Sequence, residues 1–203
     1  MPDLTRSQFC ELIKLPPETV KTMDRRWQLP FSIDQTTWGR GYSAFEAFLM
    51  ITAQEFNEGH GVNLNRSAEI AAALPDVLAP KWSRIVETAR QMIDGTGQTA
   101  GDIMCGRYSI AGVHPPRPIA GTDAEIDEEL AATAEPIIRS IRSSASRSLR
   151  LLLDRCARQG IDIPEKFYSG PFIYRPRPNT GELMKSSMEG LIAAGVHLQP
   201  IDD

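Results

Sequence analysis

The chain has 203 residues, with 22 Lys and Arg against 26 Asp and Glu, a formal net charge of −4 and an isoelectric point near 5.5. This length can bury a core in one domain or two small ones, and 41% apolar with 24% charged residues is typical of a globular chain. The acidic balance argues against charge-driven binding to nucleic acid. We expect no signal peptide, no transmembrane helix and, from three scattered cysteines, no disulfide framework, which together favour a cytoplasmic location.

Charge is distributed unevenly along this acidic chain. Residues 1–80 and 122–203 are each net −3, whereas residues 81–121 are net +2. Inside the first segment, residues 14–40 are net +2, because five basic residues outnumber three acidic ones. The basic residues of this stretch are Lys14, Lys21, Arg25, Arg26 and Arg40. A surface for nucleic acid is therefore expected in this stretch.

The first two predicted elements are short helices joined by a tight turn. Thr5 and Gln8 form the pattern of a capping box, which predicts a helix over residues 6–13. A break at residues 14–16 follows, and Pro17 suits the first position of a second helix, which ends near residue 27. The expected inner face of the second helix consists of Val20, Met23 and Trp27. The two helices together have the arrangement of a helix-turn-helix.

The next elements are a hairpin and two helices. Residues 31–42 mix aromatic, β-branched and turn residues, which favours a short β-hairpin. Ser43 is the predicted N-cap of a third helix that ends near residue 58. Asn65 is the predicted N-cap of a fourth helix over residues 66–74. The order of helix, turn, basic helix, hairpin and helix indicates a winged helix-turn-helix at residues 1–75.

Residues 76–121 are expected to connect two parts of the chain. A helix is predicted over residues 82–93, and a Gly- and Pro-rich linker over residues 94–121. Within the linker, residues 107–113 also suit a short strand.

The C-terminal region, residues 122–203, is expected to be helical. Apolar residues from Ile126 to Cys156 recur every three or four positions, which predicts one long amphipathic helix over residues 123–159. Pro136 interrupts this pattern, either as a kink or as the start of a second helix capped by Thr133. The predicted fold class is therefore mainly α, with the short hairpin wing and one long helix.

The apolar stripe of the long helix has two interpretations. It either packs inside its own chain or pairs with the same helix of a second copy in an isologous contact. We favour a homodimer, since palindromic DNA sites match two-fold symmetric proteins. The dimerisation residues would be Ile126, Leu130, Ile137, Ile141, Leu149 and Leu152.

The N-terminal third also resembles a known family of DNA-binding proteins. The major groove of B-DNA admits one α-helix, and a helix-turn-helix holds its second helix at the angle that this requires. Over residues 4–75 the chain resembles the MerR-type winged helix-turn-helix. The segments that carry the resemblance are FCELIKLPPETV at 9–20, DRRWQLP at 24–30, GRGYS at 39–43 and GVNL at 61–64.

The resemblance implies roles for individual side chains. It implies a wing contact to phosphate from Arg40, and a backbone contact or a packing role for Tyr42. It implies base or phosphate contacts from Thr19, Lys21, Thr22, Arg25 and Arg26. The expected function is sequence-specific binding of double-stranded DNA by a transcriptional regulator, with a recognition helix at about 17–27 and a wing at about 31–42.

Two other functions agree with the same sequence. One is an excisionase-like recombination factor of a mobile element, and the other is a protein-interaction or virion-assembly component. Enzyme motifs are not found, so we expect no catalysis. Three isolated histidines favour neither a metal site nor a cofactor. The expected partners are double-stranded DNA, a second copy of the chain, and RNA polymerase or another protein.

Overall fold

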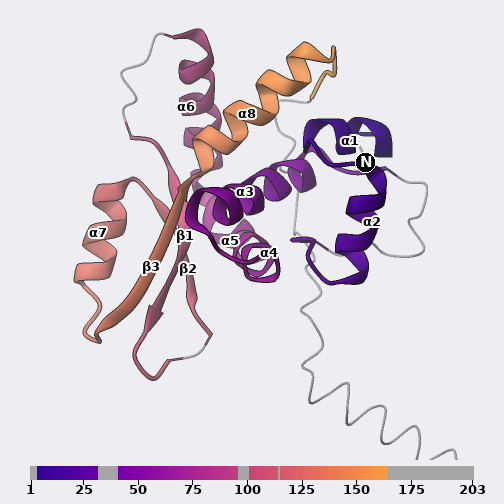
Figure 1. Cartoon of the computed structure of the whole chain (residues 1–203). Coiled ribbons are helices and arrows are strands. Elements are labelled where there is room, and N and C mark those ends of the chain that lie inside the picture. Colours follow the sequence, from indigo (N-terminus) through magenta and orange to yellow (C-terminus); the bar gives the residue numbers. More distant parts are fainter. Residues whose placement is uncertain (1–3, 32–40, 96–100, 114, 164–203) are drawn as a thin grey trace, which may run out of the picture.

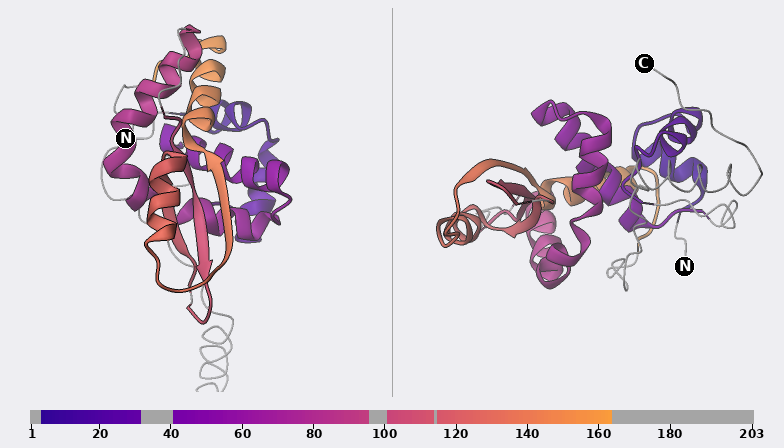
Figure 2. Two further views of the ribbon diagram at one scale, coloured as in Figure 1. Left: turned by 90° about the vertical axis from the view of Figure 1, so that its left-hand side faces the viewer. Right: turned by 90° about the horizontal axis from the view of Figure 1, so that it is seen from below.

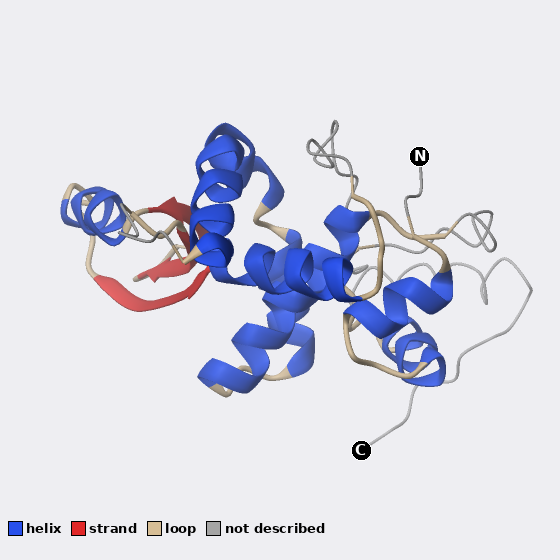
Figure 3. Ribbon diagram, turned by 90° about the horizontal axis from the view of Figure 1, so that it is seen from above, coloured by secondary structure: helices blue, strands red, loops and turns tan. Residues whose placement is uncertain are grey.

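The two ends of the molecule differ in secondary structure. The computed structural model describes residues 4–31, 41–95, 101–113 and 115–163. A helix-turn-helix lies at one end, and a three-stranded antiparallel sheet lies at the other, with further helices between them (Figures 1 and 3). The protein is therefore mixed α/β, and the mainly α fold class predicted from the sequence is wrong.

The helix-turn-helix forms as its local sequence predicts. α1 (Arg6–Leu12) begins with the Thr5–Gln8 capping box, in which each side chain binds the backbone N–H of the other residue. α2 (Pro17–Arg25) begins with a proline in its first turn, where the missing N–H breaks no helical hydrogen bond. Between them Lys14 has a φ of 59°, the left-handed conformation that reverses the chain within the turn.

The following helices agree with prediction except at one cap. α3 (Ala44–His60) has the Ser43–Glu46 capping box and ends at Gly61, whose φ is 63°. α4 (Leu64–Ala72) is capped by Asn63 and not by Asn65, because the Asn63 side chain accepts the Arg66 N–H at 2.9 Å. The side-chain oxygen of Asn65 instead accepts a hydrogen bond of 2.9 Å from Gln28, which ties α4 to the end of α2.

The predicted linker is largely a β-hairpin. α5 (Pro75–Leu78) and a single 3₁₀ turn, η2 (Ala79–Lys81), lead into α6 (Trp82–Asp94), close to its predicted bounds. After α6, β1 (Met104–Ile110) and β2 (Arg117–Gly121) pair in antiparallel register. The linker prediction is therefore wrong for residues 104–121, although β1 overlaps the short strand that residues 107–113 suit. Two of the glycines, Gly106 and Gly121, lie within the paired strands. An added Cβ on Gly106, for example, would lie 1.9 Å from the Ile141 carbonyl oxygen.

The predicted long helix is three elements. α7 (Asp123–Ala131) ends before Pro136, β3 (Ile137–Ser144) pairs with β1, and α8 (Ala145–Arg158) begins directly after it. Pro136 thus neither kinks a helix nor starts one. Apolar residues spaced three or four apart occur in strands as well as in helices, and pairing with β1 is what makes residues 137–144 a strand.

The sheet order is β2-β1-β3, and helices cover both faces. Tyr108, Ile110 and Ile119 face α7 and form a small apolar cluster with its Ile126; Figure 2 shows α7 lying along this outer face. The opposite face contributes Cys105, Ala120 and Ile141 to the main core. A register shift between Ser109 and Ile110 explains why Ile137 and Ile141 lie on opposite faces.

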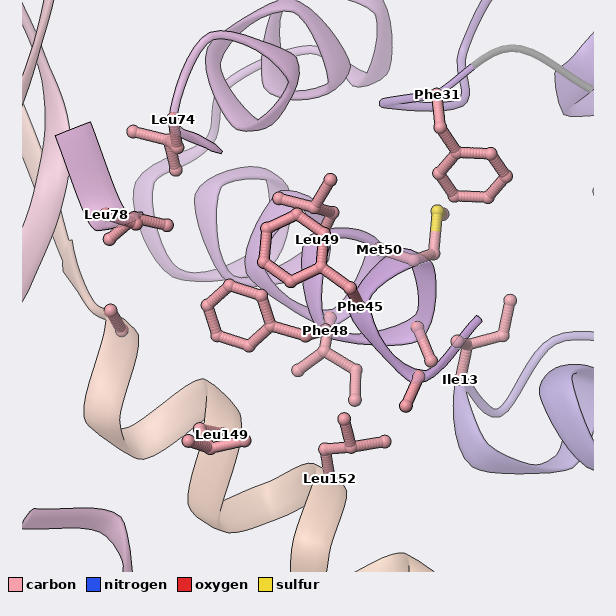
Figure 4. Close-up of a cluster of buried hydrophobic side chains, with 14 of the residues drawn as sticks. Ile13, Phe31, Phe45, Phe48, Leu49, Met50, Leu74, Leu78, Leu149 and Leu152 are labelled. Carbon is pink, nitrogen blue, oxygen red and sulfur yellow. The ribbon is translucent and has the colours of Figure 1, made fainter. Parts of the chain in front are cut away.

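The main core joins the two ends of the molecule. It is one connected cluster of buried side chains drawn from residues between Leu4 and Cys156, so it includes residues on both sides of the domain boundary predicted near residue 75. Figure 4 shows part of it, where Phe48 of α3 lies toward Leu149 and Leu152 of α8.

The predicted dimerisation stripe is thereby distributed inside one chain. Ile126, Leu149 and Leu152 are at most 1% exposed, and Ile141 is 8% exposed. Leu130 and Ile137 are partly buried against the small cluster under α7. These six residues do not form one surface, since they come from three elements and pack in two separate clusters. A homodimer stays a prediction, and it would need a different surface.

Candidate nucleic-acid interface

α2 is half buried and half exposed, as a recognition helix requires. Val20 and Met23 are 1% and 5% exposed and face the core. At 100° per residue, Glu18, Thr22 and Arg25 lie on the opposite face, and all three are exposed. The carboxylate of Glu18 lies in the first turn, where it interacts favourably with the positive end of the helix dipole.

Contacts from two distant helices fix the turn that orients α2. Gln54 of α3 donates a side-chain hydrogen bond of 2.9 Å to the Ile13 carbonyl. Arg155 of α8 donates a hydrogen bond of 2.5 Å to the Leu12 carbonyl. These carbonyls lie at the C-terminal end of α1, where the helix itself supplies no N–H partner. The angle of α2 therefore depends on the C-terminal half of the chain as well as on α1.

The five residues assigned to DNA contact on α2 fall into three positions. Thr19, Thr22 and Arg26 line a groove of about 290 Å³ between α2, α3 and α4. Arg25 lies on the exposed face of α2. Lys21 lies on the side of α2 away from the groove and is half-buried, with its Nζ 3.9 Å from the Glu18 Oε2. Thr22 donates its hydroxyl proton to the Glu18 carbonyl at 2.8 Å. Its oxygen therefore remains available as an acceptor.

Arg25 and Arg26 are two cations at the end of α2, near the carboxylates of Asp24 and, for Arg26 in the groove, of Glu58. In the part of the chain that the structure describes, neither guanidinium forms an ion pair or a side-chain hydrogen bond. A guanidinium offers several N–H donors in one plane, which suits phosphate oxygens and the acceptor edge of guanine. The face of α2 therefore combines donors from two arginines with acceptors from two threonines.

Tyr42 is placed at the base of the predicted wing. Its backbone pairs with that of Leu4 through hydrogen bonds of 2.8 and 2.9 Å. Its ring stacks on Phe9 with centroids 4.0 Å apart and planes 12° apart, and burial raises the pKa of its phenol. The packing role that the resemblance implies is thus present. Arg40 and most of the predicted hairpin, residues 32–40, lie outside the described residues.

Trp27 is exposed, which corrects the inner face predicted for α2. Its side chain is 49% exposed, and its φ of 55° places it in the left-handed conformation at the end of the helix. That conformation turns the chain, so that the Gln28 N–H binds the Met23 carbonyl at 2.8 Å. Leu29 and Phe31, at 5% and 4% exposure, fill the core in its place.

A second basic group lies away from α2 and was not predicted. Arg66 of α4, Arg107 of β1 and Arg139 of β3 line a hollow of about 430 Å³ together with Ser109. We call it the arginine hollow. The sequence does not predict it, because residue 139 is expected in a helix and nothing in the local pattern pairs it with residue 107. Their proximity follows from β1–β3 pairing alone.

Other chemistry has little support in the described residues. Cys10, Cys105 and Cys156 are buried, and burial raises the pKa of each thiol, that of Cys156 to about 12. A reactive thiolate is therefore disfavoured at neutral pH. Across residues 4–31, 41–95, 101–113 and 115–163, no group of three metal-ligating side chains gathers. Within the same ranges, every helix is too short or too polar to span a bilayer.

Comparisons of the chain with protein-family models, with curated proteins and with solved structures gave no match.

Proposed function

We propose that the protein binds double-stranded DNA in a sequence-specific manner, with α2 as the recognition helix, and that it regulates transcription. The observation that carries this proposal is the pair of arginines at the end of α2, with Arg25 on its exposed face and Arg26 beside Thr19 and Thr22 in the groove, neither in an ion pair within the described residues. The major groove accepts such a helix, and arginine and threonine bind base edges and phosphates.

The overall charge of the protein supports specific rather than general binding. At a net charge of −4, the acidic surface elsewhere repels the DNA backbone. Affinity must then come from the small basic surface on α2 and from base contacts, so binding should be salt-sensitive and weak at random sequences.

The test is binding-site selection with the full chain, followed by fluorescence anisotropy on the selected duplex. We expect Arg25→Ala and Arg26→Ala each to weaken binding by roughly tenfold, and Arg26→Ala to lower the salt slope by about one. Arg150→Ala, which removes an exposed arginine of α8, is the matched control and should bind like the wild type. Failure to enrich any sequence, or equal affinity of all four proteins, would overturn the proposal.

The location of the sites in a genome separates regulation from excision. Sites at promoters support a regulator, which would contact RNA polymerase or another protein. Sites at the ends of a mobile element support an excisionase-like factor on the same helix-turn-helix.

A protein-interaction function is the second candidate, and one observation favours it. Trp27, next in sequence to Arg26 of the groove, is 49% exposed, and Leu64, which lines the groove between α2, α3 and α4, is 40% exposed. Exposed tryptophan is enriched where proteins bind each other. If Trp27→Ala left duplex binding unchanged but abolished binding to RNA polymerase, this surface would serve a protein partner.

A further inference from the structure

The arginine hollow gathers three cations without matching anions. On antiparallel strands, residues in register share a face, and Ser109 pairs with Arg139 while Arg107 pairs with Ile141. Arg107, Ser109 and Arg139 therefore project from the same face of the sheet, the face that also contributes Ile141 to the main core. Arg66 approaches from the first turn of α4, so cations from three elements line one space.

The hollow lacks the carboxylates that usually neutralise such a cluster. Its lining in the described chain contains no Asp or Glu. Outside the lining, the carboxylate of Glu69 lies 3.5 Å from the Arg66 guanidinium in an exposed ion pair. Exposed ion pairs contribute little to stability. Arg107 and Arg139 form neither an ion pair nor a side-chain hydrogen bond within the described residues.

The electrostatic effect on Arg107 reflects this imbalance. Burial and the charges of Arg66 and Arg139 lower the pKa of the Arg107 guanidinium to about 10, while Glu69 acts in the opposite direction. The group still carries its charge at neutral pH. An anion between the three guanidinium groups would relieve their mutual repulsion, which is a reason for an anion to bind there.

Geometry favours a tetrahedral oxyanion over a small halide. Guanidinium forks match pairs of phosphate oxygens, and each such hydrogen bond is charge-assisted and strong. The Ser109 hydroxyl is a further donor at the same site. The N-terminal end of α4, with Asn63 and Arg66 in the lining, adds the positive end of a helix dipole.

We propose that the arginine hollow binds a phosphate group. This goes beyond DNA recognition by α2 and does not depend on it. Two sources carry the same chemistry, namely a free phosphorylated small molecule and a backbone phosphate of a bound duplex. Asn65, hydrogen-bonded to Gln28 beside α2, lies in the same turn of α4 as Arg66, so one duplex lying across this turn would be the second source.

The first arm of the test measures inorganic phosphate binding to the full chain by calorimetry at constant ionic strength. We expect saturable binding by the wild type and about tenfold weaker binding by Arg139→Gln, because a charge-assisted contact is lost. Arg107→Lys keeps the charge but loses the fork, and should also weaken binding. Arg117→Gln is the matched control, since Arg117 is exposed on the same sheet but lies in register with Tyr108 on the opposite face.

The second arm titrates the same four proteins with the duplex selected for α2. If the phosphate is that of a DNA backbone, Arg139→Gln lowers the salt slope by about one and inorganic phosphate competes with the duplex. If the ligand is a free phosphorylated molecule, duplex binding stays equal and only phosphate affinity changes. If none of the four proteins binds the duplex, DNA recognition by α2 is refuted, while the phosphate titration still tests whether the arginine hollow binds phosphate.

Circular dichroism of each variant verifies that the fold is intact. The proposal is overturned if Arg139→Gln and Arg107→Lys match Arg117→Gln in both phosphate and duplex titrations.

Discussion

On α2, Arg25 and Arg26 have no carboxylate partner among the described residues, whereas Arg142 of β3 lies 3.2 Å from Asp123 and 2.6 Å from Asp127 of α7. In the same layer, Glu125 is bound by both Lys81 and Arg84. At the sheet end, opposite charges hold α7 against its neighbours. At the helix-turn-helix end, Arg25 and Arg26 form no ion pair within the described residues. Arg142 therefore serves structure by holding α7 on the sheet, whereas Arg25 and Arg26, like Arg107 and Arg139 of the arginine hollow, form no ion pair within the described residues.

The two regions nevertheless depend on one core and on each other. α8 follows directly from the sheet, yet its Arg155 binds the carbonyl that ends α1. We therefore expect changes at the sheet end to affect the whole protein, and changes in surface charge to act locally.

The largest expected effect is at the closest contact of the sheet. In Gly106→Ala, the added Cβ would lie 1.9 Å from the Ile141 carbonyl oxygen and 3.0 Å from the Arg142 Cα, so the backbone of β3 must move. We expect a loss of about 3 kcal/mol in the free energy of unfolding, measured with urea. Gly59→Ala in α3 is the control, because its Cβ meets no atom within 4 Å. It should stabilise by up to about 1 kcal/mol, and equal effects of both would contradict the β1–β3 register.

The second effect tests whether α8 belongs to the core or to a dimer surface. Leu152 is fully buried, so Leu152→Ala should cost about 3 kcal/mol in urea unfolding. The sedimentation coefficient should stay the same as in the wild type. Ile138→Ala, at a side chain that is 70% exposed, should change stability by less than about 0.5 kcal/mol. A Leu152→Ala protein of unchanged stability that dissociates from a dimer would restore the predicted dimerisation surface.

The smallest effect concerns the ion pairs that hold α7. The hydrogen bond from Arg84, with those from the Thr122 N–H and Lys81, lowers the pKa of Glu125 from 4.5 to about 2. Because the folded pKa is lowered, the Glu125 carboxylate stabilises the protein at pH values above its ordinary pKa of 4.5. This stabilisation disappears as the pH falls from about 4.5 to about 2. The gain is below about 1 kcal/mol because solvent screens the exposed pair.

Glu125→Gln isolates this contribution, since glutamine can still complete the capping box with Thr122. In unfolding measured between pH 7 and pH 2, the difference between wild type and variant should shrink as the pH falls. A difference that is constant over this range would show that the charge of Glu125 has no role.

The elements predicted correctly are those with strong local signals. The boxes at Thr5 and Ser43 set the starts of α1 and α3, because capping satisfies N–H groups within one turn. The exposed positions of Thr19, Thr22, Arg25 and Arg26 also follow from the spacing of Val20 and Met23 in one helix. DNA contact by these side chains remains a prediction that the experiments above address.

The elements missed are those whose stability comes from distant partners. Residues 137–144 form a strand because β1 supplies backbone hydrogen bonds and because Ile141 and Ser143 are buried, neither of which is visible in the local pattern. Trp27 lies outside the core because its backbone turns at the end of α2, and the buried apolar side chains of this segment are Leu29 and Phe31. The arginine hollow needs a turn of α4 and two strands to meet.

By itself, the sequence determined the helix-turn-helix, its caps and the basic face of α2, since these depend on interactions within a few residues. Only the tertiary structure decided the sheet, the division of the apolar stripe between two clusters and the grouping of Arg66, Arg107 and Arg139. The physical reason is that a period of three or four apolar residues fits more than one secondary structure. Strand pairing and shared burial, which join residues far apart in the chain, select among them.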